Sequence, residues 1–246
     1  MNRRKFGQLV AATALEGALL RAGGQTATAS PSEPRFSCEI FTLKLDSFDR
    51  CIEVVAEAGY QGVELIGYFQ KWTPEEQRRL MAKMRSLGLM IDMLSGLQAS
   101  FAIPGQTEEF VKRVTAHCHV ANGLECPQIN VKSGKRLEAV DPKAQFAAAV
   151  DNLKRASDAA AENGINIVIE PIDLIESPGI FLSSVQEGFE IVRSVNRPNV
   201  KVLYDFYHEQ RAGGNLIEKL EKNFAWVGLV HIADVPGRHE PGTGEI

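Results

Sequence analysis

Short apolar runs alternate with longer amphipathic stretches from residue 36 to the end of the chain. The apolar runs predict seven strands. Several of them, such as Ile167-Val168-Ile169, are continuously apolar, which is typical of parallel strands buried on both faces. The predicted strands cover residues 36–43, 62–66, 89–95, 128–132, 166–172, 200–207 and 227–233.

The stretches between these strands have the features of helices. Residues 45–58 repeat apolar side chains at helical spacing. Pro74 opens a helix over 75–87 and Pro142 opens one over 143–162, because proline fits the first turn of a helix. Three glycines stand just before predicted strands, where a left-handed residue commonly ends a helix: Gly59, Gly88 and Gly164.

Seven strands with six intervening helices predict an α/β fold. The expected architecture is a (β/α)8 TIM barrel over residues 30–246, truncated before strand eight and therefore C-terminally incomplete. An open, doubly wound sheet is the alternative. No GxGxxG motif follows the first strand, which argues against a dinucleotide-binding fold.

Composition and charge narrow the class of protein. Hydrophobic residues make up 44% of the 246 and charged residues 24%, which is ordinary for a globular protein. The net charge of −4 argues against non-specific binding to nucleic acid or to an anionic membrane. The four cysteines show no CxxC and no ligand-like spacing, so we expect small buried apolar residues rather than disulfides: Cys38, Cys51, Cys118 and Cys126.

Residues 1–29 resemble a twin-arginine-type signal peptide. Arg3 and Arg4 precede a mildly apolar run over residues 9–20, and residues 27–29 offer a small-x-small cleavage site. That run is too short to form a stable membrane anchor. The expected location is the periplasm, or the cytoplasm where the signal does not function. A basic amphipathic tail is the alternative interpretation.

Charged residues stand at the carboxyl ends of the predicted strands, where barrel enzymes carry their working groups. Glu170, Asp205 and His231 follow each other on strands five, six and seven. Two carboxylates and one imidazole from adjacent strands suit Mn²⁺, Mg²⁺, Co²⁺ or Zn²⁺. The other polar residues at or beside strand ends are Glu39, Glu64, Ser95, Lys132 and His208.

Three segments resemble the hydroxypyruvate isomerase group of the xylose-isomerase-like TIM barrel superfamily, which also includes ketose 3-epimerases and type IV apurinic endonucleases. The segments are Ile169-Glu170-Pro171-Ile172, Tyr204-Asp205-Phe206-Tyr207-His208 and residues 231–245. The resemblance implies a divalent metal ion, Mn²⁺ or Mg²⁺ ahead of Co²⁺ or Zn²⁺, with the ligands Glu170, Asp205 and His231. It also implies that three further residues contact the substrate: His208, Arg238 and Glu176.

The implied activity is a metal-dependent aldose–ketose isomerisation of a small hydroxy-carbonyl compound such as hydroxypyruvate. A proton moves between adjacent carbons through an enediolate, whose negative charge a divalent ion stabilises. Glu170 suits the role of proton acceptor, and the family carries a second carboxylate on strand eight. A small-molecule substrate is the expected partner, and a homo-oligomer is left open.

Three other functions are considered. A ketose or sugar 3-epimerase is favoured by His231, because the isomerases often carry Gln at that position and the epimerases carry His. A non-catalytic truncated barrel is the second. A DNA-repair phosphodiesterase is the least favoured, because its metal cluster needs histidines where strands two and three here end in Glu64 and Ser95.

Overall fold

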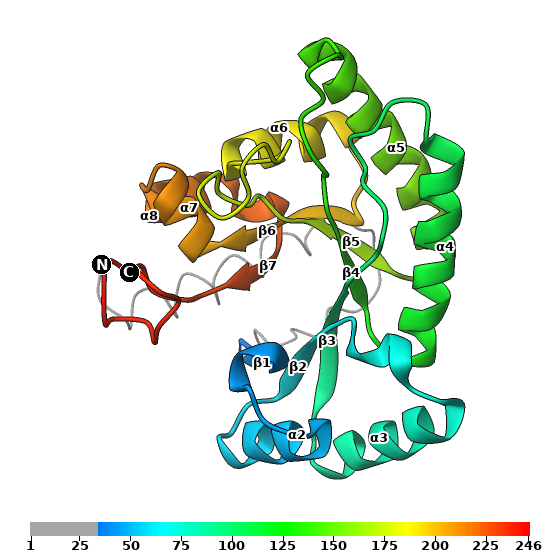
Figure 1. Cartoon of the computed structure of the whole chain (residues 1–246), viewed down its shortest axis with the longest axis vertical. Helices are drawn as coiled ribbons and strands as arrows, with labels where there is room; N and C mark the ends of the chain where they lie inside the picture. Colours follow the sequence, from blue (N-terminus) through cyan, green and yellow to red (C-terminus); the bar gives the residue numbers. More distant parts are fainter. Residues whose placement is uncertain (1–33) are drawn as a thin grey trace, which may run out of the picture.

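The computed structural model describes residues 34–246, so the predicted signal peptide at residues 1–29 lies outside the described residues. Seven parallel strands pair in chain order in one sheet, which curls into a half-barrel (Figure 1). The strands are β1 (Ser37–Glu39), β2 (Gly62–Ile66), β3 (Met90–Ser95), β4 (Gln128–Val131), β5 (Asn166–Ile169), β6 (Val200–Asp205) and β7 (Val227–His231). Within residues 34–246, β1 and β7 form the two edges of this sheet.

Helices connect the strands and surround the curled sheet (Figure 1). This alternation confirms the predicted α/β barrel architecture. The helices are α2 (Phe48–Glu57), α3 (Pro74–Ser86), α4 (Thr107–Gly123), α5 (Pro142–Glu162), α6 (Val185–Val195), α7 (Phe206–Ala212) and α8 (Leu216–Asn223), with short 3₁₀ turns η2 (Ile40–Leu43), η3 (Tyr68–Lys71) and η4 (Phe224–Trp226). In the described part of the chain, every helix is too short or too polar to cross a lipid bilayer.

The predicted helix ends are confirmed in detail. Helix α3 begins with Pro74 in its first turn, and Thr73 and Glu76 form a reciprocal capping box around it. Helix α5 begins with Pro142 after an Asp141 cap. The three predicted stop residues adopt left-handed backbone angles, with φ of +84° at Gly59, +70° at Gly88 and +69° at Gly164.

Five predicted strands end earlier than the sequence indicated, by one to four residues, and the ends of β1 and β6 show the physical reason. The strand predicted over 36–43 stops at Glu39 and turns into η2, where the Thr42 hydroxyl donates to the Glu39 carbonyl at 2.7 Å. The strand predicted over 200–207 stops at Asp205, because the Asp205 carboxylate accepts the His208 backbone N–H and so starts α7. Both corrections move residues from a strand into a loop or helix at the carboxyl edge of the sheet.

The core holds the apolar strands and three of the four predicted buried cysteines, whereas Cys38 is half-buried against it. Ile167, Val168 and Ile169 of β5 are completely buried, as expected for a strand covered on both faces. All four cysteines are free thiols, and burial raises the pKa of Cys118 to about 11 and that of Cys126 to about 12. These two thiols therefore stay protonated at neutral pH and behave as small apolar side chains, as predicted.

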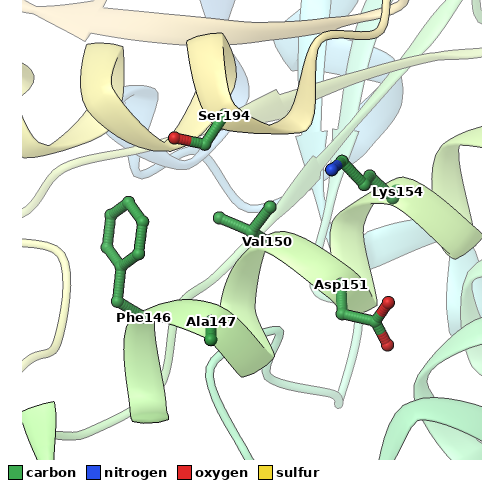
Figure 2. Close-up of a pocket in the computed structure, with 6 residues that line it drawn as sticks. All are labelled: Phe146, Ala147, Val150, Asp151, Lys154 and Ser194. Atoms are coloured by element: carbon green, nitrogen blue, oxygen red, sulfur yellow. The ribbon is translucent and has the colours of Figure 1, made fainter. Parts of the chain in front are cut away.

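The outer helix layer carries a groove of about 380 Å³ between α5 and α6 (Figure 2). Its lining contains none of the site residues that the sequence predicted, and its single acidic side chain gives it no candidate ligand set. The candidate ligands lie instead at the carboxyl ends of the strands. The groove is lined by Phe146, Ala147, Val150, Asp151, Lys154 and Ser194.

Candidate active site

The three predicted metal ligands meet at the carboxyl edge of the sheet. Asp205 pairs in register with His231 across β6 and β7, and Glu170 directly follows β5. His231 Nδ1 lies 3.6 Å from Asp205 Oδ2 and 3.9 Å from Glu170 Oε1. A ligand atom of His208 also lies within 4.8 Å of ligand atoms of Glu170 and Asp205. This spacing fits donor atoms that face one ion.

Two further side chains fix the orientation of these ligands. Asn130 on β4 donates from Nδ2 to Glu170 Oε2 at 2.8 Å, which leaves Oε1 on the side of His231. Glu64 on β2 holds His231 Nε2 at 2.9 and 3.1 Å, so the other ring nitrogen, Nδ1, faces the two carboxylates. Such outer contacts set the ring orientation and the tautomer of a ligating histidine.

The donor set attracts positive charge. Burial alone would raise the pKa of Asp205, but His231, His208 and Arg238 outweigh it and lower that pKa to about 2. Burial opposes a charged imidazole, yet the carboxylates of Glu64 and Asp205 raise the pKa of His231 well above its ordinary value. The carboxylates that favour a proton on His231 would equally favour a divalent cation, which would take the place of that proton on the ring nitrogen facing them.

The predicted substrate-contacting residues form a second, adjoining network. Arg238 Nη2 donates to His208 Nε2 at 2.9 Å and pairs with Glu176 Oε2 at 2.9 Å. The other ring nitrogen of His208, Nδ1, lies 2.7 Å from Asp173 Oδ2, so Asp173 and Arg238 hold the ring from opposite sides. The Arg238 guanidinium stacks over the Tyr207 ring at 4.1 Å. His208, Arg238 and Glu176 are thus brought together beside the ligand set.

The ligand set and the adjoining network line one polar mouth at the carboxyl edge of the sheet. The half-buried Glu39 carboxyl, at the end of β1, lies at the same mouth. Burial raises the pKa of Glu39 to about 7; His231 opposes this shift, while Glu64 and Glu170 add to it. Glu39 therefore titrates near neutral pH, unlike Asp205, which stays ionised. The mouth accordingly contains carboxyl groups with very different proton affinities.

The structure adds residues that the sequence analysis did not single out. Asn130 and Asp173 each orient a predicted site residue, and both are buried. The sequence offered a signal for each of them. Asn130 is a polar residue inside an apolar strand, and Asp173 is an acidic residue three positions after Glu170.

The segment after β7 is organised by one buried carboxylate. Asp234 accepts hydrogen bonds from five backbone N–H groups at 2.7 to 2.9 Å, and these donors outweigh burial and lower its pKa to about 2. The segment includes Arg238, so Asp234 helps to place that guanidinium at the mouth. The five donors belong to Val235, Gly242, Thr243, Gly244 and Ile246.

Asp234→Asn is expected to loosen residues 234–246, because one amide oxygen cannot replace two carboxylate oxygens that accept five donors. The wild-type contribution should be complete above the ordinary Asp pKa of about 4 and lost as the pH falls toward 2, because the folded pKa is the lower one. Amide hydrogen exchange at Gly242 and Gly244 should accelerate about tenfold or more at neutral pH. Unchanged exchange rates would contradict this role.

The chain is similar to several known proteins. The family model described as xylose isomerase-like TIM barrel matches residues 52–246. A 2-oxo-tetronate isomerase of Cupriavidus necator is 30% identical over 219 residues, covering 87% of this chain and 84% of the relative. A hydroxypyruvate isomerase of Escherichia coli is 31% identical over 219 residues, covering 86% and 84%. A crystal structure described as AP endonuclease, family 2, from Brucella melitensis superposes with a TM-score of 0.79 at 31% identity, covering 87% and 84%.

Proposed function

Because the chain belongs to the xylose isomerase-like TIM barrel family, we propose that it is an isomerase of a small hydroxy-keto acid such as hydroxypyruvate. The observation that carries the proposal is the meeting of Glu170, Asp205 and His231 at one edge of the sheet. The names of the two isomerase relatives, hydroxypyruvate isomerase and 2-oxo-tetronate isomerase, support the choice of a 2-oxo acid.

A divalent ion is part of the proposal, with Glu170, Asp205 and His231 as its ligands. Mn²⁺ and Mg²⁺ suit two carboxylates and one imidazole, and Co²⁺ or Zn²⁺ are alternatives. The chemistry that such an ion supplies when bound is stabilisation of negative charge on the substrate oxygens.

The chain's own side chains would transfer the proton and orient the substrate. Isomerisation of hydroxypyruvate to 2-hydroxy-3-oxopropanoate takes a proton from C3 and returns one to C2. Glu170 is the proposed acceptor of the C3 proton, since Asn130 fixes its carboxylate at the site. His208 and Arg238 would hold the polar end of the substrate, and Glu176 orients Arg238 and presents a carboxylate to a substrate hydroxyl.

Proton exchange tests this proposal directly. Hydroxypyruvate incubated in D₂O with the protein and Mn²⁺ or Mg²⁺ should gain deuterium on carbon. Proton NMR measures this gain as the loss of the carbon-bound proton signal. Metal analysis of the purified protein and loss of exchange after chelation test the metal. Absence of both exchange and isomerisation with any of the four ions would reject the isomerase and favour the non-catalytic barrel.

A 3-epimerase of the same family is the second candidate, and His231 is the observation that favours it. This candidate would be supported if the protein inverted C3 of a ketose such as fructose in preference to isomerising hydroxypyruvate. We do not propose a DNA phosphodiesterase despite the structural likeness to the Brucella melitensis protein. Strands β2 and β3 end near Glu64 and Ser95 rather than in histidines, and Glu64 is engaged by His231.

We also propose export through the paired arginines of the N-terminal segment. Substitution of both Arg3 and Arg4 by Lys should leave an uncleaved precursor in the cytoplasm, because the twin-arginine route is read from those residues. Cell fractionation of a bacterial host with an antibody against the barrel would measure this. Delivery of the double variant to the periplasm at the wild-type level would show that the arginines are incidental.

A further inference from the structure

Lys132 stands at the carboxyl end of β4, beside the proposed proton acceptor. Its carbonyl accepts the Phe101 N–H at 3.1 Å and its backbone pairs with Ser100, so its position is fixed. Side chains two residues apart in an extended strand share one face. Lys132 therefore lies on the face of Asn130, which bonds Glu170, and Lys132 Nζ lies 4.0 Å from Glu170 Oε2.

The other two cations of the mouth are already committed to protein partners. Arg238 pairs with Glu176, donates to His208 and stacks on a tyrosine ring. Arg211 Nη1 donates to Glu176 Oε1 at 3.0 Å and to the Tyr207 hydroxyl at 2.6 Å. Protein partners therefore hold both guanidinium groups in place before a ligand binds.

Lys132 differs from both arginines. Across residues 34–246, its ammonium group has no hydrogen-bond acceptor, and its closest ionic partner is the 4.0 Å contact with Glu170. The side chain is 49% exposed, so about half of its surface is accessible to solvent and to a ligand. An ammonium group carries three donors, and here they are available to a ligand.

The surrounding charge indicates what that ligand needs. Glu64, Glu170, Asp205 and Asp173 are all buried carboxyl residues of the mouth, and they disfavour an anionic substrate. The proposed divalent ion would meet the reacting oxygens of the substrate, so a substrate with a carboxylate needs a further cation beside that carboxylate. A neutral hydroxy-ketone needs none.

We propose that Lys132 binds the carboxylate of the substrate and so makes the site selective for a hydroxy-keto acid over a neutral hydroxy-ketone. This inference rests on the proposed isomerase function and assigns the substrate-selecting group within that site. His208 and Arg238 then serve the hydroxyl and carbonyl end, on the β6 and β7 side, while Lys132 serves the carboxylate on the β4 side.

Lys132→Met tests the inference with two matched compounds. Hydroxypyruvate carries the carboxylate, whereas dihydroxyacetone has a hydroxymethyl group in its place. Loss of one charge-assisted hydrogen bond should raise KM for hydroxypyruvate about 10- to 100-fold, with kcat within about threefold of wild type. Dihydroxyacetone should inhibit both proteins equally, and Lys132→Arg should recover most of the affinity for hydroxypyruvate.

A binding measurement separates this role from a role in proton transfer. Pyruvate keeps the carboxylate and the ketone but lacks the hydroxyl, and calorimetry should show its Kd rising about 10- to 100-fold in Lys132→Met. Lys154→Met is the control, since it removes the same charge in the outer groove between α5 and α6 (Figure 2) and should leave the Kd unchanged.

The outcomes distinguish this inference from the proposed function. An active wild type whose KM and pyruvate Kd are unchanged in Lys132→Met would overturn the carboxylate subsite and leave the isomerase standing. A fall in kcat at constant KM would equally overturn it, because Lys132 would then act on the chemical step. A wild type that neither binds pyruvate nor converts hydroxypyruvate would reject the proposed function, and the inference with it.

Discussion

Asp205→Asn is expected to lower the affinity for Mn²⁺ at least 100-fold and kcat/KM at least 1,000-fold, because it removes one of two anionic donors from the ligand set. The asparagine keeps a side-chain oxygen that can accept the His208 backbone N–H, so the start of α7 should survive. Calorimetric titration of the metal-free protein with Mn²⁺ measures this affinity.

Asp205→Ala serves as the companion variant, because it loses both the ligand and the helix cap. We expect the same loss of metal, together with a decrease in stability of about 1 kcal/mol from the missing cap. Thermal unfolding followed by circular dichroism should show a folded barrel in both variants. Wild-type Mn²⁺ affinity in Asp205→Asn would remove Asp205 from the ligand set.

Glu170→Gln is expected to reduce kcat by about 1,000-fold at saturating metal, because an amide cannot accept the C3 proton. Glutamine is nearly isosteric, and its oxygen can still accept the Asn130 amide that meets Glu170 Oε2. The matching observation is the rate of deuterium uptake at C3 of hydroxypyruvate, which should fall in parallel with turnover.

Glu176→Gln supplies the control for that experiment. Glu176 contacts Arg238 and Arg211, away from the proposed proton path, so its loss should act mainly on KM. If Glu170→Gln retained deuterium exchange while losing only metal affinity, Glu170 would be a ligand alone. The proton acceptor would then have to be sought among the other carboxyl groups, of which Glu39 has a pKa of about 7.

The barrel could be predicted from the sequence because its strands and helix starts each have a recognisable local sequence pattern. Continuous apolar runs identify buried parallel strands, and the starts at Pro74 and Pro142 are encoded within a few residues. Strand ends are less well encoded. Glu39 and Asp205 terminate β1 and β6 through hydrogen bonds of Thr42 and His208 that no apolar pattern contains.

The candidate site, too, could be predicted in part from local sequence and in part could not. Parallel strands place their carboxyl ends at one edge, so the meeting of Glu170, Asp205 and His231 could be anticipated from strand positions alone. The contact of His231 with Glu64 could not, because it spans the mouth between strands that are not neighbours in the sheet. Such a contact depends on how tightly the sheet curls, which is a property of the packed core rather than of any local segment.

The long span of that contact has a consequence for the order in which the protein assembles. Glu64 and His231 are separated by 167 positions along the chain, so their contact is strongly non-local, and the entropic cost of closing the loop must be met before it forms. The pair can form only after β7 has docked, when the intervening strands are already in place. We therefore expect the polar mouth to form late in folding, after the apolar strands of the sheet have paired.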